Sequence, residues 1–229
     1  MSDKKKEKEQ LTGSQKLEGA LNRFLAKYLK AGIVVLLAIV LVLIGLGIGS
    51  SVSKKSQQAQ FDLIDRLQSS YQDLSVMDSE DAAYQEAYDT LVGDLNALAT
   101  KSKGYPGLKA TYILGMLAYE HDDYQGALDT FKQVYDRSKQ TYMGSLALAN
   151  AAASAENLGN DALALEYWTR IIDEYGFTAA ESPKALFGQA RLQQKMGNID
   201  LAKATFQQLA DQFPTSEFAK LATNSLAVL

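Results

Sequence analysis

The chain has 229 residues, a formal net charge of −4 at pH 7, one histidine and no cysteine. Without cysteine it forms no disulfide, holds no thiolate-bound metal, has no cysteine nucleophile and cannot be acylated like a lipoprotein. Its charge is unevenly divided, because residues 1–30 carry +4 and residues 31–229 carry −8. A basic head before an acidic body is typical of a protein oriented in a membrane. The acidic body argues against nucleic acid, whose phosphates attract basic surfaces.

An uncharged segment separates the basic head, residues 1–30, from the acidic body. This segment, residues 31–53, consists mainly of Val, Leu, Ile and Gly. At about 1.5 Å per residue it makes a helix of roughly 35 Å, enough to cross a hydrocarbon core of about 30 Å. Because lysines and arginines concentrate before it, we predict one transmembrane helix with a cytoplasmic N-terminus and an extracytoplasmic body. A cleaved signal peptide, leaving a soluble adaptor, is the alternative, although the apolar run exceeds the usual length of about 7–15 residues.

Three small residues, Gly45, Gly49 and Ser53, follow one another at intervals of four within the predicted span. This spacing puts them on one helix face and lets another transmembrane helix approach closely. The partner helix would belong to a second copy of the chain or to a larger membrane complex. The alternative is that these residues have no packing role, since glycine is common in membrane helices.

Residues 54–107 are predicted to form a helical stalk that continues from the span, followed by a degenerate helical pair. Apolar residues recur every three or four positions over residues 61–74 and again over residues 84–98. This is the spacing of a helix with one buried face. Between the two stretches, the acidic and hydroxyl side chains of residues 78–80 favour a break and a new helix start. Residues 104–107, Gly-Tyr-Pro-Gly, are predicted to form a loop.

Residues 108–229 are predicted to form three helical hairpins and a terminal capping helix that begins at Ser216. In each hairpin a small alanine precedes a large aromatic side chain by four residues, and successive pairs lie 37 and 38 residues apart. The pairs are Ala127 with Phe131, Ala164 with Trp168, and Ala202 with Phe206. The alanine lets two helices approach closely, while the aromatic ring fills space toward the neighbouring hairpin. Since one such unit cannot bury its apolar face alone, the pattern predicts an all-α fold of hairpins stacked into a solenoid.

These hairpins resemble the tetratricopeptide repeat (TPR). The first has Leu114-Gly115 in its first helix, and the third ends with Pro214. The second departs from the family pattern, because Ala151-Ala152 stands in place of Leu-Gly. The period also exceeds the family's roughly 34 residues. The resemblance implies a domain that binds other proteins.

The order of basic head, single span, helical stalk and acidic repeat domain is similar to the YfgM-like ancillary subunits of the SecYEG translocon. This resemblance implies a single-pass protein of the bacterial inner membrane, with its N-terminus in the cytoplasm and its repeats in the periplasm. As partners it implies translocon subunits, periplasmic chaperones or secretory clients.

In the TPR family the first helix of each hairpin lines the binding groove. Carried onto this sequence, the resemblance implies a groove that mixes aromatic and methionine surface with a basic stripe at its C-terminal end. Its residues are Lys109, Tyr112, Met116, Tyr119, Asn157, Lys184, Phe187, Arg191 and Lys195. The alternative is that the tyrosines are ordinary packing residues and the cations a solvated face.

No motif in the sequence indicates catalysis. The single histidine, His121, lies at a predicted turn beside two aspartates, and one histidine without cysteine does not make a structural zinc site. The acidic residues gather at helix starts, where they complement the helix dipole. We therefore expect no enzyme and no cofactor, but a membrane-tethered adaptor linking the Sec translocon to chaperones or emerging clients. The alternative is a self-associating scaffold, a homo-oligomer, for envelope morphogenesis or cell division.

Overall fold

The computed structural model describes residues 17–22, 24, 27, 39 and 55–229. The chain divides into two compact units, residues 1–58 and 59–229, and the described residues of the first are helical. The predicted transmembrane helix, including Gly45, Gly49 and Ser53, lies outside the described residues apart from Ile39. Within the described ranges, no helix combines the length and the apolar character needed to cross a bilayer.

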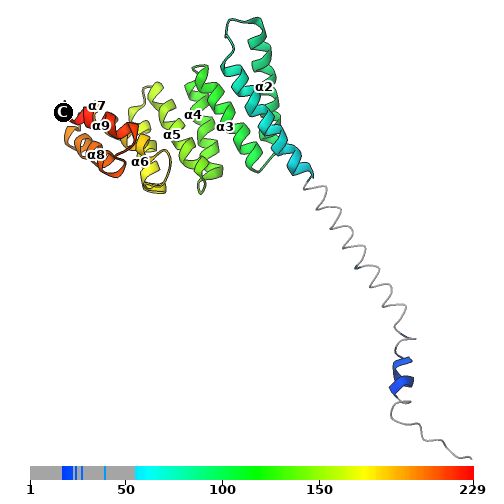
Figure 1. Ribbon diagram of the computed structural model, residues 1–229. Helices are drawn as coiled ribbons and strands as arrows, with labels where there is room; N and C mark the ends of the chain where they lie inside the picture. Colours follow the sequence, from blue (N-terminus) through cyan, green and yellow to red (C-terminus); the bar gives the residue numbers. More distant parts are fainter. Residues whose placement is uncertain (1–16, 23, 25–26, 28–38, 40–54) are drawn as a thin grey trace, which may run out of the picture. The chain divides into compact units, whose positions relative to one another are not determined.

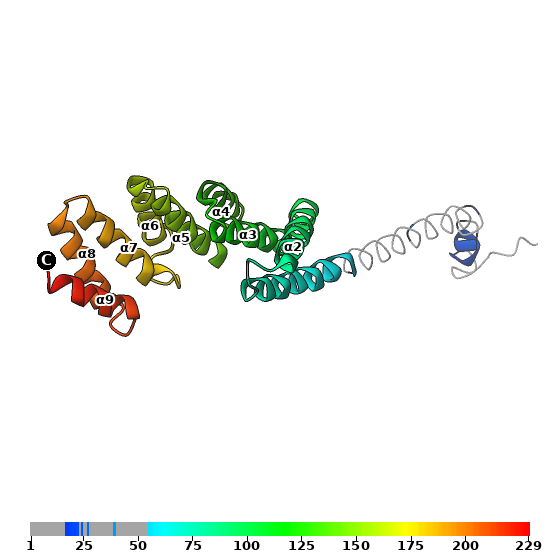
Figure 2. The same ribbon diagram turned by 90° about the horizontal axis from the view of Figure 1, so that it is seen from above.

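The second unit is built of helices, and residues 59–229 contain no strand, which confirms the predicted all-α class. The helices lie side by side in chain order (Figures 1 and 2). They are residues 59–75, α2 (Ala82–Lys101), α3 (Tyr105–Glu120), α4 (Tyr124–Ser138), α5 (Tyr142–Asn157), α6 (Asp161–Tyr175), α7 (Ser182–Lys195), α8 (Ile199–Gln212) and α9 (Glu217–Leu226). They form four pairs, whose first helices are residues 59–75, α3, α5 and α7, and α9 packs on the last pair.

Polar side chains begin several of these helices by accepting hydrogen bonds from otherwise unpaired backbone N–H groups. The Asp81 carboxylate accepts from the Ala83 N–H at 2.9 Å and starts α2, after the break predicted at residues 78–80. The Asn160 side chain starts α6, and the Ser216 hydroxyl starts α9 at the residue where the sequence predicts a capping helix. Gly197, with φ 82°, provides the left-handed turn between α7 and α8 that other residues adopt at a cost.

The prediction of a loop at residues 104–107 is mostly wrong. Only Gly104 lies outside the helix, as the N-cap of α3, while Tyr105, Pro106 and Gly107 form its first turn. A proline is tolerated there because the first-turn N–H that it lacks has no partner within the helix. The Pro-Gly pair that reads as a loop in the sequence is therefore a helix start.

The predicted alanine–aromatic pairs form the core between helices. Phe131, Trp168 and Phe206 are at most 3% exposed, and the alanine four residues before each is fully buried. Two of these rings lie against glycines of a neighbouring helix, where a larger residue would collide with them. A Cβ atom added to Gly115 of α3 would lie 2.8 Å from the Phe131 ring, and one added to Gly188 of α7 would lie 2.7 Å from the Trp168 indole nitrogen. The small residues therefore set how closely α3 approaches α4 and how closely α7 approaches α6.

Residues 59–75, predicted as part of a stalk, are packed into the repeat unit. Ile64, Leu67 and Leu74 are buried in one cluster with residues of α2 and α3. A helix that buries one face against two neighbours serves as the first helix of a pair. The degenerate pair expected from the sequence is thus a full member of the stack.

One tyrosine gives the unit a testable dependence on pH. The Tyr175 hydroxyl at the end of α6 donates a hydrogen bond to the Lys139 backbone carbonyl at 2.7 Å, and burial, above all, raises the pKa of this phenol to about 12. In the unfolded chain the phenol ionises near pH 10. The folded state therefore holds its proton longer, so its stabilising effect is complete below about pH 10 and is lost as pH rises toward about 12.

At about pH 9 the Tyr175 phenol is still protonated. We expect Tyr175→Phe to lower the free energy of unfolding there by about 0.5–1.5 kcal/mol, because phenylalanine cannot donate the hydrogen bond to Lys139. Between about pH 9 and pH 11 the variant should lose less stability than the wild type, because phenylalanine does not ionise. Urea unfolding followed by circular dichroism at both pH values measures this difference. Equal losses in the two proteins would contradict the role given to Tyr175.

Candidate protein-binding face

Side chains link the first helices of successive pairs. Between residues 59–75 and α3, the Tyr71 hydroxyl donates to the Glu120 carboxylate, and the Phe61 ring stacks on Tyr105 with centroids 6.1 Å apart. Lys109 of α3 reaches back as well, with its ammonium nitrogen 4.0 Å from an Asp65 carboxylate oxygen. The predicted groove residue Lys109 thus contributes to the joint between the first two pairs.

Two tyrosine–asparagine hydrogen bonds connect α3 to α5. The Asn150 amide donates to the Tyr112 hydroxyl, and the Asn157 amide donates to the Tyr119 hydroxyl, each at 2.8 Å. The partners of each bond are 38 residues apart in the chain, which is the spacing of the repeats. Both predicted tyrosines therefore lie on the same face of α3, about two helical turns apart, and both face α5.

Charged contacts connect the next pair to α7. The Glu156 carboxylate of α5 accepts from the Trp168 indole N–H at 2.8 Å and from the Arg191 guanidinium of α7. Lys195 of α7 lies 2.7 Å from a carboxylate oxygen of Asp161 at the start of α6. The predicted basic stripe is therefore paired in part with acidic residues of the preceding pair. We call the contacts of Tyr112, Tyr119, Arg191 and Lys195 with these partners the inter-pair row.

The cations of the inter-pair row are exposed, whereas their carboxylate partners are partly buried. The Arg191 and Lys195 side chains are 45% and 58% exposed, and the Glu156 and Asp161 side chains are 19% and 25% exposed. Pairs with one partner in contact with solvent contribute about 0–1 kcal/mol each. Each cation therefore keeps an exposed surface beside the carboxylate that it already contacts.

Three predicted groove residues turn toward the interior instead. The Phe187 ring packs between Phe206 of α8 and Phe218 of α9, each with centroids 5.8 Å from its own. Met116 is half-buried against the central core, as is Tyr112, and burial raises the pKa of the Tyr112 phenol. Their main contacts are intramolecular, so less of their surface is left for a partner.

Tyr119 is also half-buried against the central core, with its ring edge-on to Tyr124 at 5.3 Å, while Asn157 and Lys184 are exposed. The Lys184 ammonium lies 5.7 Å from the centroid of the Trp168 ring, which favours a cation there. Together with the exposed ends of Arg191 and Lys195, these groups offer hydrogen-bond donors and an aromatic edge.

The predicted set omits three residues that complete the inter-pair row, Asn150, Glu156 and Asp161. Asn150 lies 38 residues after Tyr112, Glu156 lies 35 residues before Arg191, and Asp161 lies 34 residues before Lys195. A search for hydrogen-bonding or oppositely charged side chains about one repeat period apart would find all three. Alignment of equivalent positions alone does not, because it looks for similar rather than complementary residues.

The described residues contain no group of three or more His, Cys, Asp and Glu side chains arranged to hold a metal ion. His121 follows the last residue of α3, in the predicted turn. It is exposed, yet it has partners in α2, because Tyr84 lies within 3.0 Å of its Nε2 atom and the Tyr88 ring lies 4.4 Å away between centroids. His121 thus joins α2 to the α3–α4 turn.

Residues 184–216 match the family model of the tetratricopeptide repeat. The match covers most of α7, all of α8 and the turn before α9. Together with the stacked helical pairs, it supports a TPR protein, a class that typically binds proteins and does not catalyse reactions. A search of the curated proteins gives no significant match.

Proposed function

We propose that this chain is a membrane-tethered, extracytoplasmic adaptor that links the Sec translocon to periplasmic chaperones or emerging secretory clients. The TPR match suggests a protein–protein interaction module. The observation that carries the binding role is the inter-pair row, where exposed cations and tyrosine–asparagine pairs follow one another across three helical pairs. Aromatic and arginine side chains are the residue types that most often anchor protein interfaces.

The tether is inferred from the sequence. An uncharged stretch of residues 31–53 follows a head of charge +4, which favours an inner-membrane span with the head in the cytoplasm. Attachment to the membrane would hold the repeat domain at a high effective concentration beside membrane partners. Weak binding by the inter-pair row would then suffice for function.

The inter-pair row also indicates how a partner would bind. Arg191 and Lys195 are held in place by Glu156 and Asp161, so an incoming carboxylate meets cations that are already ordered. Tyr119 and Asn157 add a hydroxyl and an amide at an adjacent joint. We therefore expect an extended or helical segment with acidic and polar side chains to lie across these joints.

A photoreactive amino acid at Asn157 in living cells tests this function. We expect crosslinks to translocon subunits, chaperones or secretory clients. Arg191→Ala should lower their yield about tenfold, the loss typical of an interface anchor. The same photoreactive residue at Gln133, exposed on α4, serves as the matched control and should give few of these adducts.

Equal adducts from positions 133 and 157 would contradict a specific binding face. Crosslinks from position 157 to a second copy of the chain, or to division and cell-wall proteins, would replace the adaptor with a self-associating scaffold. Circular dichroism of Arg191→Ala checks that the variant is folded, which is expected because the Arg191 side chain is 45% exposed and Glu156 keeps the Trp168 indole N–H as a partner.

A further inference from the structure

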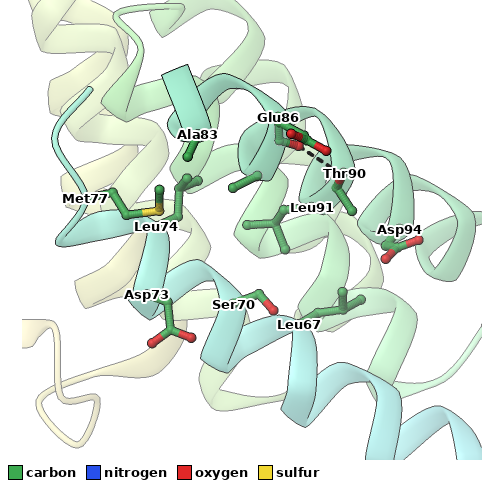
Figure 3. Close-up of a pocket in the computed structure, with 11 residues that line it drawn as sticks. Leu67, Ser70, Asp73, Leu74, Met77, Ala83, Glu86, Thr90, Leu91 and Asp94 are labelled. Atoms are coloured by element: carbon green, nitrogen blue, oxygen red, sulfur yellow. Dashed lines mark hydrogen bonds between the residues drawn. The ribbon is translucent and has the colours of Figure 1, made fainter. Parts of the chain in front are cut away.

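A pocket opens between the two helices of the first pair, away from the inter-pair row. It has a volume of about 440 Å³ and lies between residues 59–75 and α2 (Figure 3). Leu67, Leu74 and Leu91 line its floor, and these leucines are at most 5% exposed. Binding pockets typically have volumes of about 300–1,000 Å³. The space is thus sufficient for one or two large apolar side chains.

Small residues keep this pocket open. Ser70 faces it from the first helix, and Ala83 and Ala87 face it from α2. Terminal repeats of a solenoid usually carry a polar outer face for solubility. Solubility alone requires only polar side chains and no hollow, because a leucine at one of these small positions would fill the space. The pocket therefore needs an explanation beyond capping.

The rim of the pocket is acidic. Asp73, Glu86 and Asp94 line it and are exposed (Figure 3). In the described part of the chain, no ion pair or hydrogen bond engages the carboxylates of these three residues. The surrounding pair, residues 59–101, has nine acidic and two basic side chains. An apolar floor with unpaired carboxylates around it complements a ligand that is apolar at its centre and cationic at its edges.

We propose that this pocket docks a short basic amphipathic helix of a partner protein, at a site separate from the inter-pair row. One or two large apolar side chains of that helix enter the pocket, and lysines or arginines on either side meet Asp73, Glu86 and Asp94. The floor from Leu67 to Leu74 extends about 10 Å, which corresponds to about two helical turns. The repeat unit of a second copy is disfavoured as the occupant, because two such acidic surfaces repel each other. The basic head of a second copy is disfavoured because its expected place is on the opposite side of the membrane.

Fluorescence anisotropy with the full-length protein tests the proposal. The probe is a fluorescein-labelled helical peptide with leucines at i, i+3, i+4 and i+7 and lysines elsewhere. We expect saturable binding, and no binding of a peptide with glutamate in place of every lysine. The triple variant Asp73→Asn/Glu86→Gln/Asp94→Asn should bind about tenfold more weakly. The matched control, Glu166→Gln/Asp173→Asn/Asp211→Asn, removes as much charge elsewhere and should bind like the wild type.

A plugged pocket separates docking from charge attraction. Ala83→Trp places an indole at an exposed position that lines the pocket and leaves every carboxylate in place. We expect this variant to bind the lysine–leucine peptide at least tenfold more weakly, while Arg191→Ala, which alters only the inter-pair row, leaves peptide binding unchanged. Equal weakening by the control triple variant, or full binding by Ala83→Trp, would overturn the proposal. Self-association that Ala83→Trp abolishes in sedimentation experiments would overturn it as well.

Discussion

Trp168→Ala is expected to lower the free energy of unfolding by about 3–5 kcal/mol, the range for removing a large aromatic ring from a core. Trp168 is 3% exposed and connects three helices. Its ring lies against Gly188 of α7, and its indole N–H donates to Glu156 of α5. Alanine would leave a cavity between the α5–α6 pair and the α7–α8 pair and free the Glu156 carboxylate from one partner. Urea unfolding of the full-length protein, followed by circular dichroism, measures the loss.

The position of Trp168 adds a second expectation. In a solenoid each pair contacts only its neighbours, so a weakened joint reduces cooperativity along the chain. The variant should therefore unfold over a broader urea range than the wild type. Trp168→Phe, which keeps a ring but no N–H, should lose less than Trp168→Ala. Leu158→Ala, at a side chain that is 42% exposed, should cost far less. A loss below about 1 kcal/mol for Trp168→Ala would contradict this packing.

Gly107→Ala is expected to destabilise the protein by about 2–3 kcal/mol, although it adds a single methyl group. A Cβ atom at residue 107 would lie 2.9 Å from the carbonyl carbon of Ser102 and inside van der Waals contact with the carbonyl oxygen. Both Gly107 and Ser102 are buried at the corner between α2 and α3. The obstacle is backbone and cannot rotate away, so the whole corner must shift.

Gly93→Ala is the matched control for this substitution. Gly93 lies in α2, is exposed, and has no atom within 4 Å of an added Cβ atom. Because alanine favours a helix over glycine by about 0.5–1 kcal/mol, this variant should be more stable than the wild type. Thermal unfolding of both variants gives the comparison. Stabilisation by Gly107→Ala as well would show that the α2–α3 corner is not closed as described.

Helix positions and much of the core could be predicted from the sequence, because both depend on local patterns. Apolar spacing of three and four residues identifies a helix with one buried face wherever it occurs. The alanine–aromatic pairs, such as Ala164 with Trp168, are predicted to pack and are buried. The helix start predicted at Ser216 and the one at Asp81, one residue after the predicted residues 78–80, depend on a side chain and a backbone N–H within three residues of each other. No distant part of the chain is needed for these features.

What the binding residues do was decided by tertiary structure. Phe187 reads as a groove residue from its place in the repeat, yet α9 covers it with Phe218, whose distance along the chain no periodicity reveals. From the sequence, Arg191 is predicted to be a cation of the binding groove. In the structure it forms an ion pair with Glu156 of the preceding helical pair. These contacts join residues 31 or more positions apart, and their geometry depends on how the pairs stack.

The acidic pocket is the clearest case of this division. Composition and spacing are enough to predict that residues 59–101 are helical, amphipathic and rich in carboxylates. Only the packing of residues 59–75 against α2 placed Ser70, Ala83 and Ala87 opposite one another and left space above the leucines. A hollow is a property of two facing surfaces, and a one-dimensional pattern describes only one surface at a time.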